Sequence, residues 1–341
     1  METLQEVLVS EPPLSPTQIG LDDGYATTKI ALPSGRVFAF PSRARVGAAA
    51  ITSLNVHHIN VREYETGGCR YTAGAVDGES TRFDDYPFSN LNRVIVQHAL
   101  QEAGLDGSAL HVVSGLPVGA FYHADGNKRL DVIARKTANL LTIVAPTDGR
   151  LPAEVASHEV IPEALAAWYD HVLTDGPEGA RLDAEKVRTP LGVVDIGGRT
   201  TDYVVVESES ILHRSSGSLR CGLLDVKQQL AEQLQRRFDL ADVSERTVEE
   251  AVRTRSVRLF GQTHDVSELL EPALREVVER IHAETRRQLG QGATLERVLF
   301  VGGGALALAS HIRQWFPNQV IAPMPVFANA RGMLKYLRYV A

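Results

Sequence analysis

The sequence predicts an α/β protein built from two similar halves. The chain has 341 residues, which is enough for about two domains, or for one domain with two lobes. A strand, an Asp-x-Gly turn and a second strand occur around residue 22 and again around residue 195. An apolar strand at 297–301 then runs into three consecutive glycines and a helix, which is a typical α/β connection.

The first half is expected to alternate between strands and helices after a polar tail. Extended, apolar stretches bounded by turn residues predict strands at 19–21, 28–32, 36–40, 111–115 and 155–161, and a hairpin at 64–73. Apolar residues at helical spacing predict helices from the N-cap Ser89 to Gly104, at 127–141, and from Pro162 to about 172. Residues 174–190, rich in glycine and proline, are the best candidate for an interdomain linker.

The second half is expected to begin in the same way and to end in helices. Its predicted strands are 191–194, 203–207 and 297–301, with a turn at Gly302-Gly303-Gly304. Its predicted helices are 222–238, 244–256, 267–290, 305–315 and 329–339. The domain prediction is a flexible tail at 1–17, a first domain at 18–188 with a small subdomain at 45–85, a second domain at 189–325 with a helical subdomain at 230–292, and a C-terminal helix at 326–341 that returns to the first domain.

Composition and charge exclude several classes of protein. With 44% hydrophobic and 23% charged residues, the chain is neither disordered nor a coiled-coil rod. A net charge of −7 makes direct DNA binding a poor prediction, because contacts to phosphates need a basic surface. Two cysteines cannot form a disulfide framework, and the longest near-apolar run, 298–309, is too short to span a bilayer. We therefore expect a cytoplasmic protein that does not bind a membrane.

The paired Asp-x-Gly turns suit a site that holds phosphate from two sides. A tight glycine turn points backbone N–H groups outward, where they can bind an anion. Asp22 and Asp195 cannot bind phosphate themselves, but they could hold Mg²⁺ through water. Lys29, on the returning strand, could point back at a phosphate as a point charge, and Thr27 and Thr200 add hydroxyl donors. The alternative is a pair of unrelated acidic hairpin turns.

Two further features leave alternatives open at this point. The strand followed by Gly302, Gly303 and Gly304 permits close approach of a flat or anionic ligand, but it is equally compatible with a packing turn. Glu163 could orient or deprotonate a water molecule, but from the residues alone a carboxylate that stabilises a helix N-terminus is preferred. The sequence has no Walker A motif, so a P-loop nucleotidase is excluded.

Taken together, the ordered motifs resemble those of the actin, heat-shock-chaperone and sugar-kinase superfamily. The matching segments are Asp22-x-Gly24-x₄-Lys29, Gly115-Leu116-Pro117, Ile161-Pro162-Glu163, Asp195-Ile196-Gly197-Gly198-x-Thr200-x-Asp202 and Val301-Gly302-Gly303-Gly304. The Gly-Leu-Pro run and the hairpin at 64–73 are most similar to the ParM/StbA group of plasmid-segregation actins. The resemblance covers about residues 17–341. It implies an actin-like fold of two lobes, each a mixed sheet flanked by helices, with the nucleotide in the cleft between them.

The resemblance also implies a role for individual residues. Those expected to bind nucleotide and phosphate are Asp22, Asp23, Gly24, Tyr25, Thr27, Lys29, Gly197, Gly198, Arg199, Thr200, Gly302, Gly303 and Gly304. Glu163 and Asp195 are the expected catalytic residues, with Asp22 and Asp195 serving Mg²⁺ through water. Two positions depart from the family pattern. Tyr25-Ala26 replaces small polar residues, and Arg199, where threonine or glycine is usual, could either contact phosphate or point away.

The function implied by the resemblance is ATP-dependent filament formation for plasmid DNA segregation. ATP would favour a closed protomer, closed protomers would stack head to tail, and hydrolysis by this ATPase would destabilise the filament. Such a protein would need a DNA-binding adaptor on a centromere-like plasmid site. GTP in place of ATP stays open. The alternatives are a small-molecule or sugar kinase of the same superfamily, a bacterial cytoskeletal actin, and a binding module without hydrolysis.

Overall fold

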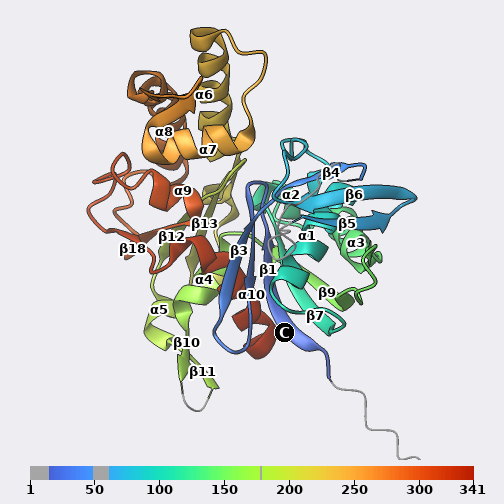
Figure 1. Ribbon diagram of the computed structural model, residues 1–341. Helices are drawn as coiled ribbons and strands as arrows, with labels where there is room; N and C mark the ends of the chain where they lie inside the picture. The colour runs from blue at the N-terminus through green and yellow to red at the C-terminus, as the bar shows by residue number, and fades with distance from the viewer. Residues whose placement is uncertain (1–14, 49–60, 177–178) are drawn as a thin grey trace, which may run out of the picture.

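Two mixed sheets, one in each half of the chain, form the framework of the computed structural model (Figure 1). The structure describes residues 15–48, 61–176 and 179–341. The first sheet consists of β1 (Thr17–Asp23), β2 (Thr27–Ala31), β3 (Val37–Pro41), β7 (Ala109–Leu116) and β9 (Glu154–Pro162), in the order β3-β2-β1-β7-β9. The second consists of β12 (Leu191–Ile196), β13 (Thr201–Glu207), β14 (Ser210–Ile211), β15 (Gly217–Leu219), β18 (Arg297–Val301) and β19 (Gln319–Ile321), in the order β14-β13-β12-β18-β19, with β15 beside β13.

The two sheets are built on the same plan, as the internal repeat predicts. Each begins with an antiparallel hairpin, β1–β2 or β12–β13, whose turn carries the Asp-x-Gly motif. In each sheet the first strand of the hairpin also pairs in parallel with the next long strand, β7 or β18, and that strand pairs in parallel with β9 or β19. The predicted α/β fold with two mixed sheets flanked by helices is therefore confirmed.

A small antiparallel sheet and three helices accompany the first sheet. The small sheet consists of β4 (Ala44–Val46), β5 (Val61–Thr66), β6 (Cys69–Gly74) and β8 (Ala145–Pro146). The helices are α1 (Asn90–Glu102), α2 (Val118–Phe121) and α3 (Leu130–Leu141). The predicted hairpin at 64–73 and the helix capped by Ser89 are both present, and the Ser89 side chain accepts a hydrogen bond from the N–H of Asn92 at 3.1 Å.

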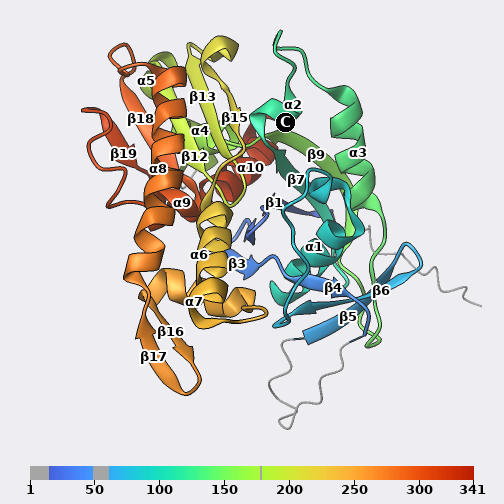
Figure 2. The ribbon, with the colours of Figure 1, turned by 90° about the horizontal axis from the view of Figure 1, so that it is seen from above.

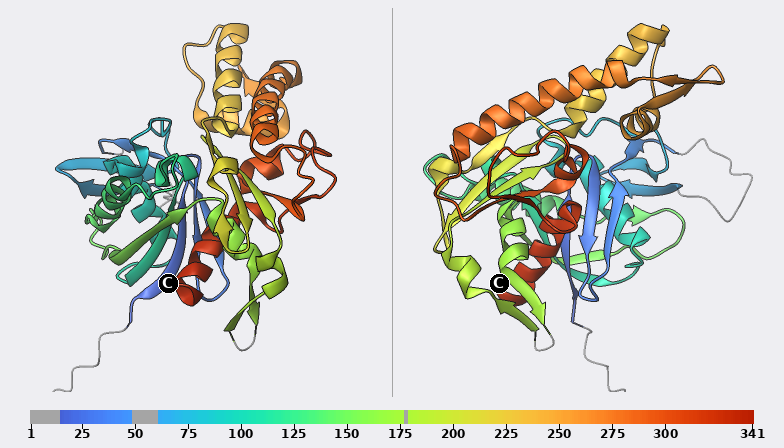
Figure 3. Two further views of the ribbon diagram at one scale, coloured as in Figure 1. Left: turned by 180° about the vertical axis from the view of Figure 1, so that it is seen from behind. Right: turned by 90° about the vertical axis from the view of Figure 1, so that its left-hand side faces the viewer.

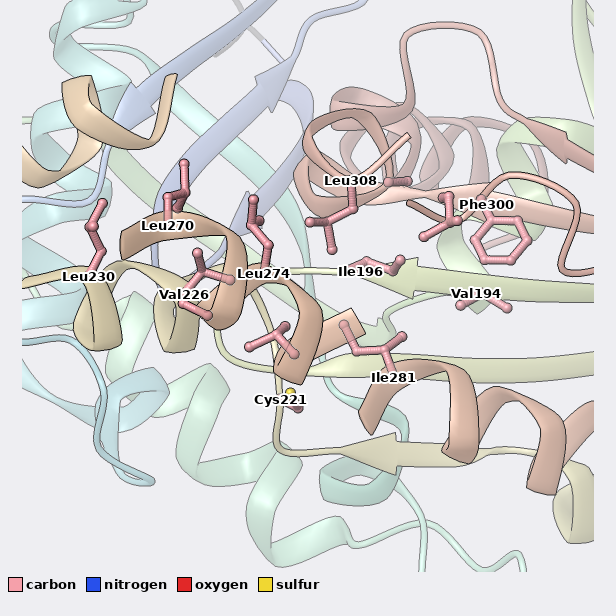
Figure 4. Close-up of a cluster of buried hydrophobic side chains, with 14 of the residues drawn as sticks. Val194, Ile196, Cys221, Val226, Leu230, Leu270, Leu274, Ile281, Phe300 and Leu308 are labelled. Atoms are coloured by element: carbon pink, nitrogen blue, oxygen red, sulfur yellow. The ribbon is translucent and has the colours of Figure 1, made fainter. Parts of the chain in front are cut away.

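The helices of the second half extend beyond its sheet at one end. They are α6 (Leu223–Phe238), α7 (Glu245–Thr254), α8 (Ser267–Leu289) and the short α9 (Gly302–Ala307). Their buried faces share one core with the sheet, in which Leu274 and Ile281 of α8 approach Ile196 and Phe300 (Figure 4). Because this core is continuous, the helices hold a fixed position on the strands that carry the second Asp-x-Gly turn.

The last helix, α10 (Ala328–Tyr339), packs against the first half of the chain (Figure 3). It lies against β1 and against α4 (Leu165–Val172), and Met333 is buried with Val113 and Ile161 of the first sheet. The approach is so close that a Cβ built on Gly332 would lie 1.6 Å from the carbonyl oxygen of Ala166. Glycine at 332 is therefore required for this helix to dock.

Two predicted helix boundaries are wrong. Pro162 does not open a helix: it is the last residue of β9, where it pairs with Leu116, and α4 begins only at Leu165. Proline is tolerated there because β9 lies at the edge of the sheet. Likewise, the glycines at 302–304 are not a turn before a helix at 305–315. They form the first turn of α9, which already ends at Ala307.

Other sequence predictions in the connecting regions also need correction. The expected linker at 174–190 contains the hairpin β10 (Leu173–Gly176) and β11 (Gly179–Leu182), followed by α5 (Ala184–Arg188). The helical region at 230–292 contains a hairpin that the sequence analysis did not predict, β16 (Ser256–Leu259) and β17 (Gln262–Asp265). Of the predicted tail at 1–17, residues 1–14 lie outside the described residues and Thr17 already belongs to β1. Residues 49–60 of the predicted small subdomain lie outside them as well.

Candidate functional site

The two Asp-x-Gly turns face each other across one cavity of about 540 Å³. The turns touch, because a Cβ built on Gly198 would lie 2.9 Å from the Cβ of Ala26. All the site residues that the sequence analysis predicted line this cavity, namely Asp22, Asp23, Gly24, Tyr25, Thr27, Lys29, Glu163, Asp195, Gly197, Gly198, Arg199, Thr200, Gly302, Gly303 and Gly304. A cavity of this volume is typical of a site for a small ligand.

The first turn presents an ion pair to the cavity. Asp22 and Lys29 are opposite one another in the register of β1 and β2, and the Lys29 Nζ lies 3.2 Å from the Asp22 Oδ2. Both side chains are largely buried. Burial raises the pKa of Asp22, while the nearby Lys29 ammonium lowers it. A positive charge and a carboxylate therefore stand side by side at the end of this strand.

Asp23 lies on the cavity wall but makes its contacts within the first half. Its Oδ2 accepts a hydrogen bond from the Asn92 Nδ2 at 2.7 Å and forms an ion pair with Lys136, which is almost fully buried. Of the two adjacent aspartates, Asp22 pairs with the lysine of its own hairpin, whereas Asp23 joins the hairpin to α1 and α3. This arrangement favours a structural role for Asp23 over the phosphate contact that was predicted.

The second turn carries a carboxylate whose charge is unfavourable in the ligand-free cavity. Burial, and next the charge of Asp22, raise the pKa of Asp195 to about 7. Its Oδ2 accepts a hydrogen bond from the Asn329 Nδ2 of α10 at 2.6 Å. The turn itself is closed by a hydrogen bond of 2.9 Å from the Gly197 N–H to the Thr200 carbonyl. Asp195 is thus held in place from the last helix of the chain.

Gly302 brings the start of α9 directly against the second turn. Its φ is +86°, a conformation that favours glycine. A Cβ at this position would lie 2.3 Å from the Asp195 Oδ1 and 2.5 Å from the Ile196 carbonyl oxygen. No other residue fits here without displacing Asp195, and Gly302 also lines the cavity.

Glu163 reaches the cavity from the first half. Its N–H donates to the Leu116 carbonyl at 2.8 Å, and a Cβ built on Gly115 would lie 2.7 Å from its Cγ. Burial raises its pKa well above the usual range, and the charge of Asp202 adds to this effect. The residue precedes α4 and lines the cavity, so the geometry favours the site role over the helix-terminus role.

Asp202 is a buried carboxylate beside this site, to which the sequence motif assigns no role. It stands opposite Asp195 in the register of β13 and β12. Burial raises its pKa to about 6, although hydrogen bonds from Ser218 and Val118 oppose the shift. The alternation of side chains along β13 could have drawn attention to it, since Thr200 and Asp202 follow the turn closely.

Helices of the second half also contribute to the lining of the cavity. These lining residues include both apolar and polar side chains. They are Leu223, Lys227, Glu249, Val252, Arg253, Arg255, Leu274, Ala307, Ser310 and His311. The Lys227 Nζ lies 3.0 Å from a Glu249 oxygen. No local motif marks these residues, because four separate helices or turns bring them together.

Several ion pairs join the two halves beside the cavity, and we call three of them the cross-cavity pairs. They are Arg43–Glu249 at 2.5 Å, Arg82–Asp225 at 2.7 Å and Arg199–Asp84 at 2.7 Å. Arg199 also lies over the Tyr25 ring, 5.7 Å from its centre. Figure 2 shows α6 and α7 of the second half beside β3 of the first.

In residues 15–48, 61–176 and 179–341, no three His, Cys, Asp or Glu side chains are grouped closely enough to bind a metal directly. Over the same ranges, no helix is both long and apolar enough to cross a membrane.

Comparison with known proteins finds similarity in both halves of the chain. Residues 18–174 match the family described as "Plasmid segregation protein ParM, N-terminal". Residues 193–314 match the family described as "Archaeal actin homologue MreB-like, C-terminal". The two halves of the chain are therefore each similar to a family of actin-like proteins. Among named relatives, it is 26% identical to an archaeal actin homologue of Thermoplasma volcanium, over 92% of this chain and 96% of that protein.

Solved structures of actin homologues have the same fold. The archaeal actin homologue Ta0583 in complex with ADP superimposes with a TM-score of 0.70 at 20% identity, over 94% of this chain and 99% of the other. A protomer of a 15-stranded ParM filament from Clostridium botulinum gives 0.74 at 18% identity, over 95% and 99% of the two chains. The similarity to an actin-like protein therefore extends over nearly the whole chain.

Proposed function

We propose that the protein binds a purine nucleoside triphosphate with Mg²⁺ in the cavity and hydrolyses it. The observation that carries this proposal is the placement of both Asp-x-Gly turns on one cavity, in contact with each other. Phosphate bound between them would contact backbone N–H groups from both halves. The ADP complex of the archaeal homologue supports the choice of ligand.

The carboxylates of the cavity fit a hydrated divalent cation. Asp22 and Asp195 are buried oxygen donors on opposite turns, and Mg²⁺ is held in proteins by few carboxylates and several waters. A bound Mg²⁺ would supply positive charge that offsets the repulsion between these carboxylates and the phosphates. Lys29 would contact phosphate as a second positive charge.

Glu163 is the proposed acceptor for the proton of the attacking water. Its buried position raises its pKa, which makes it a stronger base than an exposed glutamate. The same carboxylate would orient the water by a hydrogen bond. Asp195, on the opposite turn, would position the hydrated cation. These assignments are the ones that the family resemblance implies.

We further propose that nucleotide binding favours head-to-tail association of protomers into filaments. A heterologous contact of this kind does not close on itself and therefore extends into an open polymer. The support is the similarity to a protomer of a ParM filament. Hydrolysis would remove the γ-phosphate from between the two turns and destabilise the polymer.

The biological role that we propose is plasmid DNA segregation through a DNA-binding adaptor. It rests on the match of residues 18–174 to the N-terminal part of plasmid segregation protein ParM. The match of residues 193–314 to an archaeal MreB-like family favours a second candidate, a cellular actin homologue. Capture of a DNA-bound adaptor by the nucleotide-loaded protein would decide for segregation.

The proposed function is tested by measuring phosphate release and sedimentation together. The purified protein should release phosphate from ATP and pellet with a non-hydrolysable ATP analogue, and GTP should be assayed in parallel. Glu163→Gln should bind nucleotide but release phosphate at least about a hundredfold more slowly. Failure of the wild-type protein to bind either nucleotide would contradict the whole proposal. Failure to pellet over a wide concentration range would contradict polymerisation alone.

A further inference from the structure

Two polar side chains of the second half hold the chain segment that follows β7 and lies beside Glu163. The short helix α2 begins at Val118, directly after Pro117. The Val118 N–H donates to the Asp202 Oδ1 at 2.7 Å. The next N–H, that of Gly119, donates to the Ser218 Oγ at 2.8 Å. Both N–H groups belong to the first turn of a helix and therefore have no partner within it.

Asp202 and Ser218 are themselves coupled. They stand opposite one another in the register of β13 and β15, and the Ser218 hydroxyl donates a hydrogen bond to the Asp202 Oδ1. Asp202 is almost completely buried, so its carboxylate needs these donors. The Asp202 Oδ1 thus accepts one hydrogen bond from a side chain of its own sheet and one from the backbone of the other half.

A short chain segment connects this contact to Glu163. Residues 115–119 run from the end of β7 into α2, and the Leu116 carbonyl accepts the N–H of Glu163. At Gly115 the strand packs so tightly on the Glu163 side chain that a Cβ would lie 2.7 Å from its Cγ. Holding Val118 and Gly119 against β13 and β15 therefore fixes where Glu163 stands relative to the second Asp-x-Gly turn.

We propose that Asp202 and Ser218 are positioning residues for the hydrolytic reaction, holding Glu163 at the correct distance from the phosphates bound at the second turn. This inference rests on the proposed function. It assigns to β15, which carries no predicted site residue, a part in the reaction. Small displacements of a reacting group have large effects on rate, so loosening this contact should reduce turnover more than binding.

The experiment compares four variants of the full chain: Ser218→Ala, Asp202→Ala, Asp202→Asn and the matched control Ser216→Ala. The Ser216 Oγ, next to β15, accepts a hydrogen bond from the Val205 N–H at 3.0 Å. Its hydrogen bond is therefore to β13 and not to α2. Ser218→Ala and Asp202→Ala should lower kcat for ATP by about tenfold or more, with KM within about twofold of wild type. Asp202→Asn keeps an acceptor for the Val118 N–H and should lose less than Asp202→Ala. Ser216→Ala should behave as wild type.

A second measurement tests the contact without relying on turnover. Hydrogen exchange of a peptide covering residues 115–122 should be at least about tenfold faster in Ser218→Ala than in wild type, and unchanged in Ser216→Ala. Equal exchange rates in the three proteins would overturn the inference, as would a wild-type kcat in Ser218→Ala or an equal loss in Ser216→Ala. If the wild-type protein releases no phosphate, the proposed function fails, whereas the exchange result still decides whether Ser218 anchors α2.

Discussion

Replacing Asp195 with asparagine should stabilise the ligand-free protein at alkaline pH while removing its proposed activity. The folded-state pKa of Asp195 is raised from 3.8 to about 7, chiefly by burial. A carboxyl group whose pKa is raised on folding stabilises the folded state only while it is protonated. The free energy of unfolding therefore falls as the pH rises from about 4 through 7. A difference of about three pKa units corresponds to about 4 kcal/mol at pH 8.

Asparagine has nearly the shape of aspartate but carries no charge. Its side-chain oxygen can still accept the hydrogen bond from the Asn329 Nδ2. The variant should therefore avoid most of the desolvation cost that the wild-type carboxylate meets. The stability difference between variant and wild type should grow from about 2 kcal/mol at pH 5 to about 4 kcal/mol at pH 8.

The assay is thermal unfolding in EDTA, without nucleotide, at a series of pH values between 5 and 8. At pH 8 the variant should melt about 6 °C above wild type. The exposed Asp77→Asn serves as control and should shift nothing. With Mg²⁺ and ATP present, the wild type should recover stability and the variant should not, because its site lacks the charge that holds the cation. A variant that melts below wild type at pH 8, or a pH-independent difference, would refute the electrostatic account.

Three further predictions follow from contacts described above. Gly302→Ala should weaken nucleotide binding at least about tenfold, because its Cβ would meet Asp195, as titration with a fluorescent ADP analogue can show. Gly303→Ala is the control for the neighbouring glycine. Nothing lies within 4 Å of its added Cβ, so the melting temperature should not change. Arg82→Ala removes one cross-cavity pair, which is worth about 0–1 kcal/mol. At low salt, small-angle scattering without nucleotide should show a larger radius of gyration for this variant than for wild type. In 0.5 M salt this difference should disappear. Gly332→Ala should destabilise the fold by about 3 kcal/mol or more in chemical unfolding, since its Cβ would overlap the Ala166 carbonyl.

The residues that were predictable are those whose role depends on local sequence. Asp22 and Asp195 each follow an apolar strand and precede a glycine turn, and a turn of this kind is encoded within a few residues. Because the same pattern occurs twice, the two sheets and the facing turns could be inferred from the sequence. Ser89 as a helix cap was predictable for the same reason.

The residues that were missed are brought in by distant parts of the chain. Lys227 and Glu249 meet at the cavity only because α6 and α7 pack on the same core. Asp202 acquires its partners from α2 and β15, which no spacing within 195–202 reveals. Pro162 is compatible with both a helix start and an edge strand, and the pairing of β9 with β7 decides between them.

The docking of α10 on the first sheet has a consequence for biosynthesis. The hydrophobic layer beneath β1, β2 and β7 is closed by Ala330, Met333 and Leu334, which the ribosome adds some three hundred residues after β1. A nascent chain that has emerged only as far as the first sheet leaves that layer exposed to water. The first half is therefore completed only after residues 328–339 have emerged from the ribosome, and a fragment ending near residue 188 should aggregate unless residues 328–339 are supplied as a separate peptide.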